Sequence, residues 1–169
     1  MEALIEKVNH YRRNYSIIAR AHYLSASYLE SLNAWLGIPA LLLSIAICTT
    51  LSLSGSEGFP QIIITIAGVA SLFVALLTGL QVFIRASERS MEHRAAGARF
   101  ADVRRRLELM SIKFQNNDNN NFNDCIYELE NMLVELRELG ALCPKIPDQY
   151  YRKAEREYKI ENESDQNQK

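Results

Sequence analysis

Charge is absent from two long parts of this sequence. Residues 31–56 and 58–84 contain no Asp, Glu, Lys or Arg, and Glu57 alone separates them, although 23% of the chain is charged. A helix of about 20 apolar residues is long enough to cross a hydrocarbon core of about 30 Å. The two stretches therefore predict a transmembrane helical hairpin. The alternative is a soluble bundle that buries both helices, but this would need a much larger protein around them.

Residues that commonly carry chemistry are also scarce. The three cysteines, Cys48, Cys125 and Cys143, form no C-x-x-C pair, so we expect free thiols in a reducing compartment. The sequence has no Gly-rich phosphate loop, no nucleophile elbow, and no H-x-x-x-H or H-E-x-x-H metal motif. The net charge of −1 does not indicate a nucleic-acid partner. We therefore expect no enzyme, no catalytic or metal-binding residues, no cofactor and no direct nucleic-acid binding.

The predicted spans are residues 34–53 and 61–84, joined by an extracytoplasmic loop at 54–60. The second span holds fourteen Leu, Ile, Val and Phe residues, which favour insertion by roughly 4 to 8 kcal/mol in sum. The first span is weaker, because small and polar residues dilute its nine Leu and Ile residues. Pro39 is expected near its first turn, which limits the damage from the missing N–H, and Trp35 is expected at the membrane interface.

Basic residues predict the orientation of the hairpin. The loop at 54–60 contains no Lys or Arg, whereas both flanks of the hairpin are rich in Arg. The positive-inside rule then places both termini in the cytoplasm. The flanking residues are Arg12, Arg13 and Arg20 before the first span, and Arg85, Arg89, Arg94, Arg99, Arg104, Arg105 and Arg106 after the second.

Each span carries small residues at four-residue spacing, which let helix backbones approach closely in lipid. The two sets either face each other within one hairpin, or pack between subunits and line a wet path. A pore would require an oligomer, because two helices cannot enclose one. The sets are Ala40, Ser44, Cys48 and Ser52 in the first span, and Ala67, Ser71, Ala75 and Gly79 in the second.

Heptad spacing outside the spans predicts cytosolic helices packed as a coiled-coil-like bundle. Residues 1–33 are expected to form one helix leading into the first span. Residues 85–114 are expected to continue the second span unbroken, since Gly97 is the only Gly or Pro between Leu80 and Phe114. The predicted seams are Leu4, Val8, Tyr11, Tyr15, Ile18, His22, Ser25 and Leu29; Arg89, His93, Ala96, Phe100, Val103, Leu107, Met110 and Phe114; and Ile126, Leu129, Leu133 and Leu136.

The remaining boundaries follow from turn-forming residues. The Asn-rich run at 115–123 predicts a linker, and residues 124–160 predict C-terminal helices interrupted near Pro144 and Pro147. The polar residues 161–169 predict a disordered tail. The fold class is thus an all-α membrane protein, in which a two-transmembrane hairpin is extended by long cytosolic helices and is expected to form oligomers.

Two polar groups are candidate sites. The first is a cluster beneath the membrane, which would act as a switch or ligand sensor, or would be a structural polar layer that fixes helix register. The second is a run of three arginines, which would grip phosphates of lipid or nucleotide, or would be a solvated face and topology signal. The first comprises His22, Glu30, Glu88, Arg89, Glu92 and His93, and the second comprises Arg104, Arg105 and Arg106.

Several short segments, in this order around a hairpin, resemble the SLATT family of two-transmembrane effectors in prokaryotic conflict systems. The resemblance extends over about residues 2–112, two thirds of the chain, and the segments are Arg20–Tyr23, Leu32–Pro39, Leu77–Gln81, Ser87–Arg89, His93–Ala96 and Arg99–Phe100. The resemblance implies a protein of the prokaryotic inner membrane that disrupts the membrane or forms a pore, and so kills or arrests an infected cell. It also implies a cytosolic sensor or nucleotide-synthesising partner. Because no nucleotide-sensor domain is recognisable, the trigger is expected to be that partner or a ligand of the cytosolic helices.

Three functions are consistent with these features. The first is an oligomeric pore-forming effector with membrane lipid and further copies of itself as partners. The second is a membrane anchor that makes no pore and recruits a cytosolic partner through its heptad seams. The third, a transporter subunit, is less favoured, because Glu57 in the loop is the only ionisable acidic or basic residue between Ser31 and Ile84.

Overall fold

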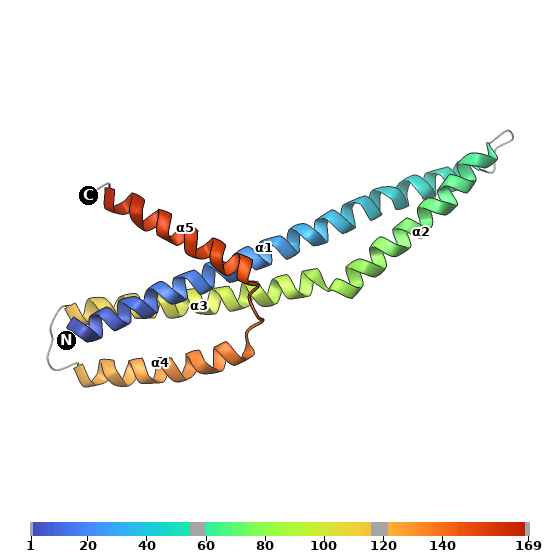
Figure 1. The fold of residues 1–169 in the computed structure, drawn as a ribbon. Coiled ribbons are helices and arrows are strands. Elements are labelled where there is room, and N and C mark those ends of the chain that lie inside the picture. The colour runs from blue at the N-terminus through green and yellow to red at the C-terminus, as the bar shows by residue number, and fades with distance from the viewer. Residues whose placement is uncertain (1, 55–59, 116–121, 168–169) are drawn as a thin grey trace. The chain divides into compact units, whose positions relative to one another are not determined.

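A computed structural model describes residues 2–54, 60–115 and 122–167, and these residues fold into helices without any β-strand. The helices are α1 (Glu2–Leu53), α2 (Gln61–Ile84), α3 (Ala86–Gln115), α4 (Phe122–Leu142) and α5 (Asp148–Asn167) (Figure 1). The all-α prediction is confirmed. Of the linker predicted at 115–123, Gln115 ends α3 and residues 122–123 begin α4, while residues 116–121 lie outside the described residues, as do residues 55–59 of the predicted loop.

The chain divides into two compact units, and α1 contributes to both. The bundle unit comprises Met1–Ser27 and Met91–Lys169, and the hairpin unit comprises Tyr28–Ser90. The bundle unit contains the start of α1, most of α3, and α4 and α5. The hairpin unit contains the rest of α1, all of α2, and the first turn of α3.

The core of the bundle unit resembles that of a water-soluble protein, because large apolar side chains are buried inside it. Side chains from the predicted seams of α1 and α3 are buried with one face of α4, in a cluster that includes Val8, Phe100, Val103, Leu107 and Met110. The face of α4 differs from the prediction, because Met132 and Leu139 are buried while Leu133 is 37% exposed. The side chain of Phe114 lies outside the described residues.

A second face of α1 holds α5. Ile17 and Ala21 of α1 are buried with Ala154 of α5, and Leu24 and Tyr158 pack around them. The predicted seam of α1 contained neither Ile17 nor Ala21, because it followed a single stripe. α1 is therefore buried on two faces in this unit.

The hairpin unit packs the end of α1 antiparallel to α2 (Figure 1). Its buried and half-buried positions recur at steps of three and four, as in a heptad seam. Along α1 they include Leu36, Ala40, Leu43, Ile47 and Thr50, and along α2 they include Ile64, Ala67, Ala70, Val74, Leu77 and Gln81.

Three predictions about the helices are wrong. The second span does not continue unbroken, because Arg85 adopts a left-handed conformation (φ 51°, ψ 38°) and its N–H bonds the carbonyl of Gln81, which ends α2. Pro39 does not lie near the first turn of a helix but in the interior of α1, which continues through it. The predicted disordered tail is helical to Asn167, and an ion pair between Arg20 and Glu161 holds its first residue against α1.

Candidate functional site

The hairpin unit presents its apolar side chains to the outside. Trp35 is 76% exposed, Leu72 66% and Phe83 83%. Both hairpin helices are long and apolar enough to cross a membrane, and only 6% of the most apolar part of each is buried. A core helix of a soluble protein would be mostly buried, so this surface is suited to an apolar surrounding medium.

The hydroxyl groups of the hairpin are bonded within their own helices. Every Ser and Thr in residues 34–54 and 61–84 donates to a main-chain carbonyl three or four residues earlier, at 2.7–3.2 Å. In a hydrocarbon medium this pattern removes the cost of an unpaired hydroxyl. The described hydroxyls therefore need no water to satisfy their donors.

The two small-residue sets do not face each other along the hairpin. Only Ala40 and Ala67 are buried, whereas Ser44, Cys48, Ser71 and the remaining members are exposed. The physical reason is the pitch of the helix: a four-residue step turns by about 40° more than a full circle, so a set with this spacing winds away from the seam. Of the two alternatives for these sets, contact within one hairpin therefore applies only to Ala40 and Ala67.

A polar bond between side chains joins the two hairpin helices. The Gln81 amide nitrogen donates to the side-chain oxygen of Asn33 at 2.7 Å, and both side chains are half-buried. Gly37 makes room for this bond, because a Cβ there would lie 3.2 Å from the Gln81 amide nitrogen. Sequence reasoning missed the pair, although an amide within each otherwise apolar segment was a signal for it.

In the bundle unit, α1 and α3 bring His22 and His93 together. Both are buried, and their Nδ1 atoms lie 2.9 Å apart. His22 also stacks on Phe100, which stacks on Tyr15, with ring centroids 5.5 and 6.0 Å apart. A hydrogen bond between two Nδ1 atoms requires that only one of them carries a proton.

Burial favours the neutral form of this histidine pair. It lowers the pKa of His22 to about 4, and the neighbouring His93 adds to the shift. Burial also lowers the pKa of His93, while the Glu92 carboxylate opposes that shift. The buried pair is a neutral polar contact in the seam, which corresponds to the register-fixing interpretation.

The other members of the predicted switch cluster do not join the histidines in a shared core. Glu92 lies in the bundle unit, but its side chain is exposed. Glu30, Glu88 and Arg89 belong to the hairpin unit and are exposed as well, and Glu88 pairs with Arg85. The described residues therefore contain a buried histidine pair, and they hold no group of three or more potential metal ligands.

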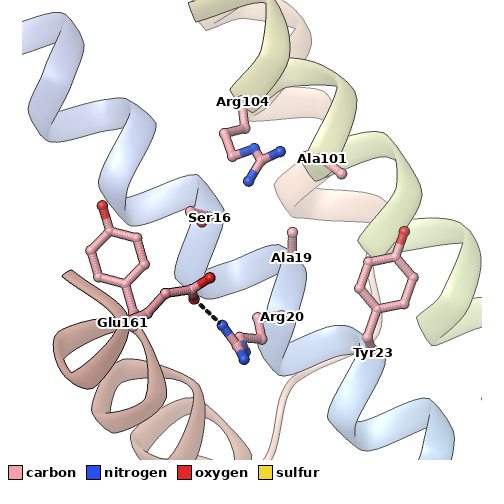
Figure 2. A pocket seen from close by; sticks show the side chains of 8 residues that line it. Ser16, Ala19, Arg20, Tyr23, Ala101, Arg104 and Glu161 are labelled. Carbon is pink, nitrogen blue, oxygen red and sulfur yellow. Dashed lines mark hydrogen bonds and ion pairs between the residues drawn. The ribbon is translucent and has the colours of Figure 1, made fainter. Parts of the chain in front are cut away.

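The three consecutive arginines lie in different surroundings, because successive helix positions are about 100° apart. Arg104 lines a recess between α1, α3 and α5 (Figure 2). Arg106 pairs with Asp102 at 2.9 Å and with Glu135 at 3.2 Å. Arg105 is exposed, and it neither lines this recess nor takes part in the ion pairs of Arg106. The three arginines therefore do not form one common phosphate-binding site.

Comparisons with known proteins give no further identification: no family model, no curated protein and no solved structure matches this chain.

Proposed function

We propose that this chain is a multi-pass protein of a prokaryotic inner membrane, which oligomerises and permeabilises the membrane on a cytosolic signal. The observation that carries the proposal is the outward-facing apolar surface of the hairpin unit. In water this surface would be a large aggregation-prone patch, whereas in a bilayer it is solvated by lipid chains. The internally bonded hydroxyls support the same environment.

The arginine distribution supports cytoplasmic termini. Arginines flank the hairpin on both sides, and the segment 54–60 lacks Lys and Arg. In this orientation the bundle unit lies in the cytosol, where its exposed ion pairs remain solvated. The bundle unit is then the part that receives a signal.

Small residues on the outside of the hairpin support self-association. Ser71, Ala75 and Gly79 lie on a face of α2 that the hairpin seam does not use. A Cβ placed at Gly79 would meet no described atom within 4 Å. Another hairpin can therefore approach this face closely, which is how helices associate in lipid.

The role in antiviral defence rests on the local resemblance to the SLATT effectors. Under this proposal the signal comes from a sensor or nucleotide-synthesising partner in the cytosol. Permeabilisation then arrests or kills the infected cell.

A membrane anchor without a pore is the second candidate. It is favoured by apolar residues that remain exposed on the bundle unit, among them Leu109 at 56%, Val134 at 61% and Tyr127 at 68%. A cytosolic partner protein can bury such side chains. In this case the hairpin serves only to hold the bundle unit at the membrane.

Membrane potential in cells separates the two candidates. The chain is expressed with its genomic neighbours and the signal is induced, while a potential-sensitive dye is followed. The triple variant Ser71→Leu/Ala75→Leu/Gly79→Leu should abolish depolarisation, because bulky side chains prevent close helix approach. The matched control Val69→Leu/Phe73→Leu/Leu76→Ile changes another exposed face of α2 and should leave depolarisation unchanged.

Two outcomes would contradict the pore. One is an intact potential with the unaltered chain under inducing conditions. The other is full activity after the hairpin is replaced by two unrelated transmembrane helices, which would favour the anchor instead.

A further inference from the structure

The bundle unit contains a recess that the proposed function does not use. It lies between α1, α3 and α5 and has a volume of about 440 Å³ (Figure 2). This volume is within the range of small-molecule sites, about 300–1,000 Å³. Its polar lining comprises Ser16, Arg20, Tyr23, Arg104, Tyr158 and Glu161.

The recess has one guanidinium that is not neutralised. Arg104 extends from α3 towards Ser16 and Ala19 of α1 (Figure 2). It forms no ion pair with any residue that the structure describes, whereas Arg106 on the same helix has two acidic partners. An anionic ligand in the recess would therefore meet a free arginine.

The second guanidinium is already occupied by carboxylates. Arg20 donates from Nε to Glu157 at 2.8 Å and from Nη1 to Glu161 at 2.7 Å. The two partners differ in exposure, since the side chain of Glu157 is 31% exposed and that of Glu161 is 62% exposed. An exposed ion pair contributes little stability, so a competing anion can replace Glu161 at small cost.

Aromatic rings flank the arginines. The ring of Tyr23 lies against α3 at Gly97, where a Cβ would come within 3.3 Å of it. Tyr158 of α5 lines the recess from that helix, and the Arg13 guanidinium lies 5.8 Å from the centre of the Tyr158 ring. These rings offer apolar contact and hydroxyl groups to the body of a ligand.

We propose that this recess binds a small phosphate-bearing molecule, which pairs with Arg104 and takes the place of Glu161 on Arg20. Phosphate is favoured over carboxylate because it carries more negative charge and more acceptor oxygens, which can form charge-assisted hydrogen bonds to two guanidinium groups. The Glu161 carboxylate, which pairs with Arg20, marks the position that the phosphate would take. Its release frees the end of α5 from α1, so the site provides an input to the bundle unit; that this input is cytosolic rests on the proposed function.

The test is binding to the full chain in a phosphate-free maltoside detergent, measured by calorimetry. The soluble probes are inorganic phosphate and adenosine monophosphate, with adenosine as the uncharged control. Arg104→Gln should weaken binding about tenfold or more, the loss expected for charge-assisted hydrogen bonds. Glu161→Gln should strengthen binding, because the internal competitor loses its charge.

Arg105→Gln is the matched control, since Arg105 is the exposed neighbour that does not line the recess. It should leave binding unchanged. Circular dichroism should show the same helix content for all three variants, because the substituted side chains are exposed. Equal losses in Arg104→Gln and Arg105→Gln would overturn the site, since they would indicate unspecific attraction to positive charge.

A lipid headgroup is the other source of phosphate. If phosphatidylglycerol added to the micelles displaces the soluble probe, and this depends on Arg104, the recess takes a headgroup. If phosphatidylglycerol does not compete, the site takes a soluble phosphate compound. The proposal is overturned if neither source shows binding that depends on Arg104. That failure is independent of the membrane-potential experiment, which tests only the hairpin.

Discussion

The two units are built from similar helices but bury opposite kinds of side chain. In the bundle unit the large apolar residues are inside, with Val8, Leu107 and Met110 at most 1% exposed. Among the described residues of the hairpin unit the buried apolar side chains are alanines, such as Ala40 and Ala67, while many large residues, such as Leu72 and Phe83, point outward. Both units use seams with steps of three and four. The pattern of the seam therefore does not decide the medium, whereas the composition of the outer face does.

The largest effect is expected from the bundle core. Leu107→Ala removes a fully buried side chain and should lower the free energy of unfolding of the bundle unit by about 2–5 kcal/mol. Leu109→Ala on the same helix is the control, because Leu109 is 56% exposed, and it should change this free energy by about 0.5 kcal/mol or less. Urea titrations in detergent would measure both. Equal costs would contradict the assignment of inside and outside in this unit.

A charge on the outer face should distinguish the two units. Leu72→Arg places a charge in the middle of α2, on an exposed side, and should disfavour membrane insertion by about 3 kcal/mol. Leu109→Arg places the same charge on the exposed surface of the bundle unit and should be tolerated. The fraction of protein that resists alkaline extraction from membranes measures insertion. If Leu72→Arg remained fully integrated, the outer face of the hairpin would not be in contact with lipid.

Acid should weaken the bundle unit. The native pKa of His22, about 4, lies below the ordinary value of 6.5, so only the unfolded chain gains a proton between these values. Stability is therefore complete above about pH 6.5 and falls as the pH decreases towards 4. The double variant His22→Gln/His93→Gln should flatten this slope, while His10→Gln, at an exposed position, should not. Thermal unfolding at several pH values measures the effect, and identical slopes for all variants would refute it.

The smallest effect concerns the polar bond of the hairpin. A double-mutant cycle with Asn33→Leu and Gln81→Leu should give a coupling energy of about 0.6–2 kcal/mol, as expected for an interhelical hydrogen bond in a membrane. Unfolding of the detergent-solubilised hairpin would measure it. Additive single variants, with no coupling, would show that these amides do not hold α1 and α2 together.

Periodicity predicted the parts of the fold that repeat. The seam positions Val103, Leu107 and Met110 are buried, and the two apolar stretches form the long helices of the hairpin unit. The approach of His22 to His93 follows from their seam positions on neighbouring helices. Each of these features has a local signal that recurs along one helix face.

Features that depend on single residues or distant partners were not predictable. The left-handed conformation of Arg85 could not be predicted, because the usual signal for it, a glycine, is absent at this position. Ion pairs such as Arg20 with Glu161 join residues 141 positions apart, so charge spacing along the chain gives no indication of them. The second buried face of α1 rests partly on Ala21 and Ala154, whose small side chains contribute little to an apolar pattern. The recess at Arg104 follows from these contacts and was missed with them.

Accessibility across a membrane tests the central claim most directly. In a cysteine-free background, Ser54→Cys lies at the loop end of α1 and Ser87→Cys lies at the start of α3. In intact spheroplasts, a membrane-impermeant maleimide should label the cysteine at position 54 and leave the one at position 87 unlabelled until the membrane is opened. Labelling of both positions in intact spheroplasts would contradict a membrane-spanning hairpin with cytoplasmic termini.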